Sequence, residues 1–96
     1  MTEAERDTRL DIWLWRARFF KTRALATAHV ARKGVRITRN GQTRKTDKAG
    51  QRVSAGDVLT FSKAKAIEMI EIIGVGERRG PAPEARSLYR RLEPGA

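Results

Sequence analysis

The feature that most constrains the fold is a change of apolar period within one stretch of the chain. Apolar residues recur three or four positions apart across residues 9–20 and again across residues 23–33, the spacing that lines one side of an α-helix. Across residues 35–38 apolar and polar residues alternate instead, as in a half-buried strand. The sequence therefore predicts two short helices, over residues 9–20 and 23–33, that lead into a strand.

The second helix and the strand both have local end signals. The Thr22 hydroxyl can accept a hydrogen bond from a free N–H group in the first turn of the helix, and Gly34 can end the helix. The pair Asn40-Gly41 suits the positive φ angles of a two-residue hairpin. We therefore expect residues 35–38 to pair with a polar, exposed strand over residues 42–45.

The remainder of the chain predicts further strands and one more helix. Residues 58–61 are rich in β-formers, and residues 63–73 suit either a helix or a strand; we interpret them as a strand antiparallel to 58–61. Residues 46–52 resemble an irregular loop, and residues 84–92 have helical spacing. The predicted fold class is α+β, with two N-terminal helices packed on a small, mainly antiparallel sheet and a short C-terminal helix.

Length and composition favour one compact unit. Ninety-six residues suit a single domain, which we divide into a flexible tail (1–8), a binding domain (9–75) and a connector with the C-terminal helix (76–96). The chain has no cysteine and no apolar run near the ~18 residues that span a bilayer, and its first residues are polar and acidic. We expect a cytoplasmic, monomeric protein with no membrane partner.

The positive charge is concentrated in one part of the sequence. Residues 9–48 contain twelve Lys or Arg and two Asp, a net charge of +10 that equals the net charge of the whole chain. A local field of this kind indicates a polyanionic partner, and a helix start flanked by Lys21 and Arg23 would provide a seat for a phosphate. The alternative for Lys21, Thr22 and Arg23 is a helix cap with solvated neighbours.

Enzyme functions have little support in the sequence. We find no nucleophile with a base, no paired carboxylates, no metal-ligand cluster and no glycine-rich phosphate loop, so we expect neither catalysis nor a cofactor. The single histidine, His29, continues the apolar stripe of the second helix, and we expect it to be packed and hydrogen-bonded rather than a ligand.

The aromatic residues of the first helix divide into two pairs. Trp13 and Phe20 share the apolar stripe and should be core. Trp15 and Phe19 lie off it and could either stack on unpaired RNA bases or be covered by the end of the chain. We expect cover, because the end of the chain has an apolar face that needs a partner: Leu88, Tyr89 and Leu92.

Three separated motifs carry a family resemblance. The segment RLDIWLWRARFFKTRALA, followed by Gly34, Asn40-Gly41 and AGDVL at residues 55–59, resembles the alpha-L (S-four type) RNA-binding motif. The RLD-x-WLW opening, the FFKTR junction and GERRGPAPEARSLY at residues 76–89 resemble the small bacterial heat-shock protein fifteen family. Together these motifs cover most of the chain.

The resemblance implies a function in RNA binding on the ribosome. It implies binding to structured ribosomal RNA, with transfer RNA as a further candidate, and association with free large ribosomal subunits that hold a stalled nascent chain, which the protein helps to recycle under stress. The alternative is sequence-independent binding of DNA or RNA, which is less favoured because no base-reading recognition helix is evident. The motif positions and the surrounding basic block give these expected RNA-binding residues: Arg9, Arg16, Arg18, Lys21, Thr22, Arg23, Arg32, Lys33, Arg36, Lys45 and Lys48.

Overall fold

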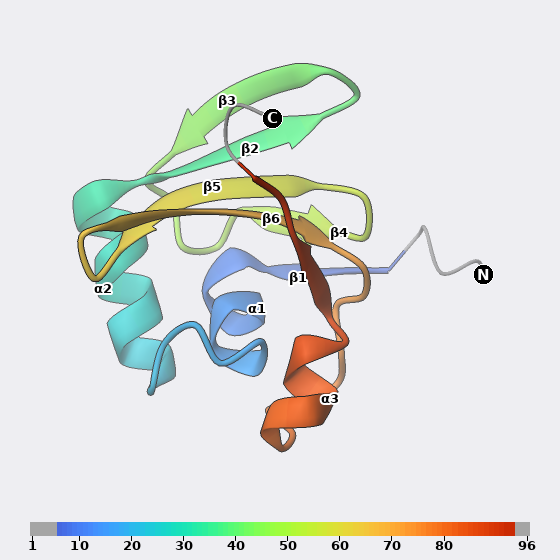
Figure 1. Cartoon of the computed structure of the whole chain (residues 1–96). Helices are drawn as coiled ribbons and strands as arrows, with labels where there is room; N and C mark the ends of the chain where they lie inside the picture. Colours follow the sequence, from blue (N-terminus) through green and yellow to red (C-terminus); the bar gives the residue numbers. More distant parts are fainter. Residues whose placement is uncertain (1–5, 94–96) are drawn as a thin grey trace.

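Two helices packed against one face of a five-stranded antiparallel sheet form the body of the molecule (Figure 1). The computed structural model describes residues 6–93. The five strands follow the spatial order β3-β2-β5-β6-β7, and a separate two-stranded sheet joins β1 and β4. The elements are β1 (Asp7–Arg9), α1 (Leu10–Arg16), α2 (Arg23–Lys33), β2 (Val35–Arg39), β3 (Gln42–Thr46), β4 (Arg52–Ser54), β5 (Val58–Lys63), β6 (Ala66–Ile72), α3 (Ala82–Arg86) and β7 (Tyr89–Arg91). The predicted α+β class is confirmed.

The second helix and the first hairpin form as the local signals predict. The Thr22 hydroxyl oxygen accepts a hydrogen bond from the Leu25 N–H at 3.1 Å, and Gly34 ends the helix with φ of 77°. Asn40 and Gly41 have φ of 52° and 78°, and Arg39 pairs with Gln42 across the turn. The helix Arg23–Lys33 and the hairpin of β2 with β3 are therefore confirmed.

The segment that suited either a helix or a strand is a strand. β6 pairs antiparallel with β5 over six residues of register, from Val58 opposite Glu71 to Lys63 opposite Ala66. The turn between them consists of Ala64 and Lys65, which have φ of 51° and 66°. A left-handed conformation costs residues other than glycine about 1–2 kcal/mol each, so this turn is strained.

The first helix is shorter than predicted. It ends at Arg16, where Arg18 turns left-handed with φ of 66°, the Arg18 N–H donates to the Trp15 carbonyl and the Phe19 N–H donates to the Leu14 carbonyl. This pair of hydrogen bonds is the Schellman ending, which usually has glycine at the left-handed position. Because that position is an arginine, the usual glycine signal for this ending is absent from the sequence, and the prediction of a helix to residue 20 is wrong.

The early end of α1 exchanges the places of the two phenylalanines. Phe19 enters the core at 5% exposure, whereas Phe20 is half-buried. The Phe19 ring lies 4.7 Å from the Tyr89 ring and 5.3 Å from the Phe61 ring, measured between centroids. Trp13 is fully buried, as expected, and the expected cover of Phe19 by the end of the chain is confirmed through Tyr89. The remaining aromatic residue off the stripe, Trp15, is half-buried.

The end of the chain is a helix and a strand, not one helix over residues 84–92. α3 begins at Ala82 inside the predicted connector, because Pro81 and Pro83 occupy positions at a helix start where no N–H donor is needed. It ends at Arg86, and Tyr89 then pairs with Ile72 at the free edge of β6. Ladder hydrogen bonds on that edge and burial of Tyr89 outweigh the helical spacing of the sequence.

The start of the chain also joins the structure. Residues 1–5 lie outside the described residues, so the predicted tail is not tested there, but residues 7 and 8 belong to β1. Thr8 pairs with Val53, and the last residue of the predicted loop, Arg52, begins β4. The predictions of a tail to residue 8 and a loop to residue 52 are corrected at these positions.

Candidate nucleic-acid interface

A buried carboxylate binds two arginines where the two helices begin. Asp11 is fully buried, and its two carboxylate oxygens each accept a hydrogen bond of 3.0 Å from Arg9. The Thr27 hydroxyl donates to the same carboxylate at 2.8 Å, and the Arg23 Nε lies 3.8 Å from Asp11 Oδ2. We call Arg9, Asp11 and Arg23 the arginine cluster.

The surroundings of Asp11 keep it ionised. Burial by itself raises the pKa of this carboxyl, but hydrogen bonds from Arg9 and Thr27, the Arg9 charge and the Ile12 N–H together hold the pKa below its usual range. The hydrogen bond to Asp11 in turn raises the pKa of Arg9. The carboxylate therefore fixes the orientation of the Arg9 guanidinium and lies within ion-pair distance of Arg23. The two arginine side chains remain 40% and 51% exposed.

The start of α2 lies beside the arginine cluster. Thr22 caps the helix, and exposed Lys21 and Arg23 flank the cap. An eleven-residue helix with no acidic residue in its first turn presents a positive dipole end and free N–H groups. The structure thus places Lys21, Thr22 and Arg23 at the start of α2, next to Arg9, and their use as a phosphate seat stays a prediction.

The loop over residues 47–51 is attached to the same place. The Asp11 N–H donates to the Ala49 carbonyl at 3.1 Å, and the Leu10 N–H donates to the Gln51 carbonyl at 2.8 Å. A Cβ atom placed on Gly50 would lie 3.7 Å from the Arg9 guanidinium, so the backbone of residue 50 runs close to Arg9. Lys48, which is exposed, therefore belongs to a loop whose position is fixed against the arginine cluster.

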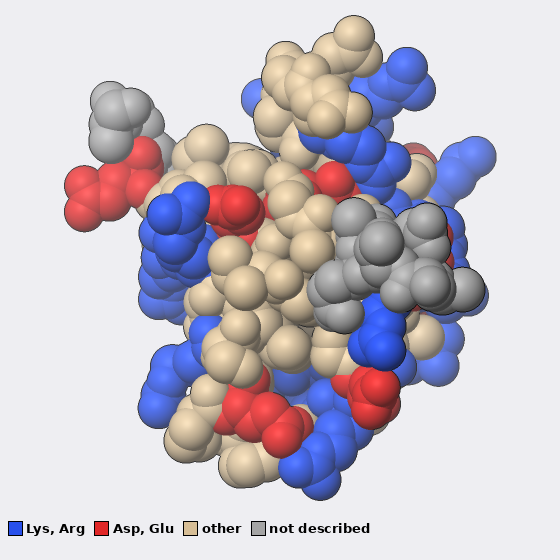
Figure 2. Space-filling view, turned by 90° about the vertical axis from the view of Figure 1, so that its right-hand side faces the viewer, with Lys and Arg blue, Asp and Glu red and all other residues tan. Residues whose placement is uncertain are grey.

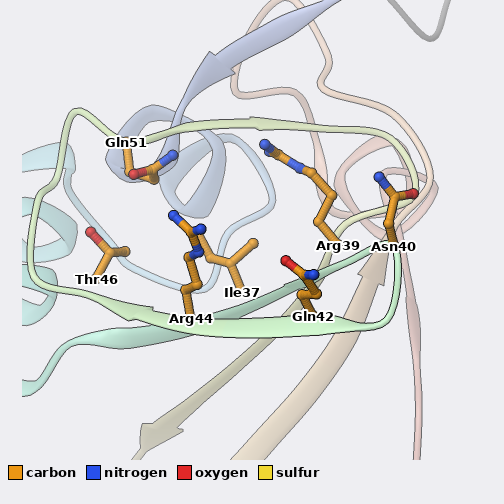
Figure 3. A pocket seen from close by; sticks show the side chains of 7 residues that line it. All are labelled: Ile37, Arg39, Asn40, Gln42, Arg44, Thr46 and Gln51. Atoms are coloured by element: carbon orange, nitrogen blue, oxygen red, sulfur yellow. The ribbon is translucent and has the colours of Figure 1, made fainter.

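A polar hollow lies between the β2–β3 hairpin and this loop (Figure 3). Arg39 occupies part of it and donates two hydrogen bonds to buried Asp57, at 2.9 and 2.7 Å. Arg44 also points into the hollow, toward Gln51. We did not predict Arg44 as a site residue, although strand alternation puts it on the same face of β3 as Gln42 and Thr46.

A second group of predicted cations meets at the other face of the hairpin. Arg36 on β2 is directly opposite Lys45 on β3, and Lys33 from the end of α2 lines the same hollow. This arrangement follows from strand alternation, since Val35 and Ile37 are buried while Arg36 is exposed. Arg32, another predicted RNA-binding residue, is exposed at the end of α2 and is not part of either group of cations.

Two of the predicted RNA-binding arginines, Arg16 and Arg18, donate hydrogen bonds within the protein. The Arg16 Nη1 donates to the Gly76 carbonyl at 2.9 Å, and the Arg18 Nε donates to the Gly80 carbonyl at 2.7 Å. Both side chains connect the end of α1 to the segment before α3. The sequence could not show this use of Arg16 and Arg18, because their partners lie some sixty residues further along the chain.

His29 is packed, as expected, but without the expected hydrogen bond. Its ring lies 4.9 Å from the Phe20 ring, and its Nε2 atom is buried with no hydrogen-bond partner in the described part of the chain. Burial lowers the pKa of His29, and the charges of Lys33, Arg32 and Lys63 lower it further. His29 is therefore neutral at pH 7, in surroundings of positive potential.

The side of the molecule near α3 differs in charge from the candidate interface. The face on the right of Figure 1, near α3, carries acidic as well as basic side chains around a neutral centre (Figure 2).

Among residues 6–93, no group of His, Asp and Glu is arranged to hold a metal ion, and no helix there is long and apolar enough to cross a membrane.

Two helices on one face of an antiparallel sheet, with a capped and cation-flanked second helix, define an alpha-L (S-four type) domain, the class that the sequence motif indicates. No protein-family model matches the chain. It is 38% identical over 90 residues to the heat shock protein 15 homolog of Haemophilus influenzae and 39% identical over 83 residues to heat shock protein 15 of Escherichia coli. These matches cover 94% and 86% of the chain, but only 65% and 59% of those relatives.

A solved structure agrees with these relatives. The trimeric structure of heat shock protein 15 from Vibrio cholerae has a TM-score of 0.73 and 38% identity, and the match covers 91% of this chain and 83% of that one. The chain belongs to the heat shock protein 15 family.

Proposed function

We propose that this chain is a non-enzymatic, cytoplasmic RNA-binding protein that associates with ribosomal RNA on free large ribosomal subunits. In this proposal the subunits carry a stalled nascent chain, and the protein helps to recycle them under stress. Membership of the heat shock protein 15 family supports a stress-related function, and the alpha-L class supports RNA as the ligand. The ribosomal step rests on the family resemblance.

The observation that carries the proposal is the arginine cluster at the start of α2. Buried Asp11 orients Arg9 through two hydrogen bonds and forms an ion pair with Arg23 beside a capped helix start, so two cations and free backbone N–H groups lie close together. Fixed guanidinium groups suit phosphate oxygens, because little side-chain entropy is left to lose on binding. Folded RNA presents phosphates at fixed positions, which suits cations held at fixed positions.

Two measurements test the proposal. Extract separated on a sucrose gradient should show the protein with free large subunits rather than with small subunits or at the top of the gradient. In fluorescence anisotropy, purified protein should bind a ribosomal RNA hairpin more tightly than a DNA duplex of the same length and sequence. Equal affinity for both would favour the alternative, a sequence-independent nucleic-acid binder.

We propose a monomer as the free state of this chain. The Vibrio cholerae relative is described as a trimer, so the two states make different predictions of mass. Light scattering coupled to size exclusion, with and without RNA, distinguishes them.

A further inference from the structure

A second groove lies between α2 and the tip of the β5–β6 hairpin, apart from the arginine cluster. Its walls come from residues 19–33 on one side and residues 62–67 on the other. Its floor is aromatic and apolar, with Phe20, Leu25 and Ile67 among its lining residues. Its rim carries four lysines, so we call it the lysine groove: Lys21, Lys33, Lys63 and Lys65.

The floor of the lysine groove is unusually exposed for apolar side chains. Within residues 6–93 the large apolar side chains that are most exposed are Ile67 at 59%, Leu25 at 53% and Ile73 at 49%, and the first two line this groove. The half-buried Phe20 ring lies beside them, with the Lys63 ammonium 5.8 Å from its centroid. Exposed apolar groups gathered in a hollow indicate a binding surface.

The charge around the groove has one sign. None of its lining residues within 6–93 is Asp or Glu. The groove continues into the hollow of Arg36 and Lys45 through the shared residues Lys33, Ser62 and Ile67. His29, which lines the groove and whose Nε2 has no hydrogen-bond partner in the described part of the chain, carries no negative charge that would offset the charge of the lysines. A ligand that fits must therefore combine closely spaced negative charges with flat or apolar groups.

The hairpin tip that carries two of the lysines is held in a strained conformation. Ala64 and Lys65 both have positive φ, and neither is a residue type that this turn favours. Such strain often accompanies a functional site. Here the two-residue turn places Lys63 and Lys65 on the rim of the groove.

We propose that the lysine groove binds an unpaired segment of RNA that continues from the base-paired part held by the arginine cluster. This inference rests on the proposed function. Single-stranded RNA alternates a phosphate with a base, which matches a cationic rim above an aromatic and apolar floor. An acidic peptide also carries negative charge. To contact both the lysines of the rim and the apolar floor, it would need acidic and apolar side chains that alternate as regularly as phosphates and bases do in RNA.

The test compares two RNA ligands in fluorescence anisotropy at 150 mM KCl. One is a labelled blunt hairpin, and the other is the same hairpin with a 3′ overhang of six uridines. Stacking contributes about 1–3 kcal/mol per base, so even one engaged base should tighten binding of the overhang RNA by about fivefold or more. The Lys63→Ser/Lys65→Ser variant should lose this gain and keep its affinity for the blunt hairpin.

A matched control has the same charge change elsewhere. Arg86 on α3 and Arg90 on β7 are exposed and lie outside both candidate sites, so Arg86→Ser/Arg90→Ser removes two positive charges without touching the groove. This control should keep the gain from the overhang. If it loses the gain as fully as the lysine variant does, the effect is general attraction and the proposal of a site fails.

The remaining outcomes separate this inference from the proposed function. If the blunt hairpin binds and the overhang adds nothing, the lysine groove does not bind unpaired RNA, but the proposed function stands. If neither RNA binds, both fail. If Ile67→Ser changes the oligomeric state and leaves the overhang gain intact, the groove is a contact between copies of the chain and the inference is overturned.

Discussion

Asp11 is the residue on which the candidate interface depends. In the sequence, Asp11 is one of two acidic residues among twelve cations, a pattern that does not distinguish a buried carboxylate from a solvated one. An Arg-x-Asp spacing in which the aspartate directly follows Leu10, the first residue of the apolar stripe, could have indicated it. Its burial next to exposed arginines shows that it organises the positive surface rather than weakening it.

Replacing Asp11 with asparagine should weaken both stability and RNA binding. The variant leaves Arg9 and Arg23 without a charged partner and should lower the free energy of unfolding by about 1–3 kcal/mol, as for other charge-assisted hydrogen bonds. Urea denaturation and anisotropy with a ribosomal RNA hairpin measure the two effects.

The control for this variant is Asp47→Asn. Asp47 is exposed in the same basic block, so both variants remove one negative charge. If only net charge matters, both should bind RNA slightly more tightly. Weaker binding by Asp11→Asn together with unchanged or tighter binding by Asp47→Asn would support orientation of the arginines as the cause.

The acid dependence of stability should also report on Asp11. Its pKa is lower in the folded state than in the unfolded state, where it is about 3.9, so its contribution is complete above about pH 4 and is lost as pH falls through the folded value. The stability gap between wild type and Asp11→Asn should therefore narrow as pH falls below about 4 toward the acid limit of folding. Thermal denaturation at a series of pH values measures it, and a gap that stays constant would contradict the assignment.

At the scale of elements, the β5–β6 hairpin has a turn that the sequence does not favour. Ala64→Asn should raise the free energy of unfolding by about 0.5–1 kcal/mol, because asparagine tolerates the left-handed conformation better than alanine. Chemical denaturation measures the change. Ala66→Asn is the control: residue 66 is in the strand, where asparagine should be neutral or destabilising.

The terminal strand should contribute strongly to stability. Tyr89 on β7 contacts the rings of Trp13 and Phe19, at 6.4 and 4.7 Å between centroids. Tyr89→Ala should lower the free energy of unfolding by about 2–4 kcal/mol and make Trp13 more accessible to acrylamide. Arg90→Ala is the comparison on the same strand, because that side chain is exposed. Equal loss in both variants would contradict the aromatic contact of Tyr89 as the main source of this stability.

Across the whole molecule, RNA binding should be strongly dependent on salt. If the arginine cluster and the lysine groove together neutralise about six phosphates, the logarithm of the affinity should fall with the logarithm of the salt concentration at a slope of about −4 to −5. Titrations in anisotropy from 50 to 300 mM KCl give this slope. Arg9→Ala should make the slope shallower by about one contact, and a wild-type slope near zero would contradict an electrostatic mechanism.

The sequence by itself determined the features whose causes are local. The cap at Thr22, the helix end at Gly34 and the Asn40-Gly41 turn depend on residues a few positions apart, and each formed as predicted. The same holds for the +10 net charge of residues 9–48, which is a property of composition alone.

Only the tertiary structure decided the features whose causes are distant in the chain. The end of α1 at a left-handed arginine, the conversion of residues 89–91 into a strand, and the use of Arg16 and Arg18 to hold the segment before α3 each depend on partners some seventeen to sixty residues away or on packing that replaces a missing glycine. The basic residues were visible in the sequence, but their division between the arginine cluster, the lysine groove and structural contacts was not. Long cationic side chains can bind any carbonyl or carboxylate oxygen within reach. Which oxygens lie within reach of each side chain is decided only when folding brings distant parts of the chain together.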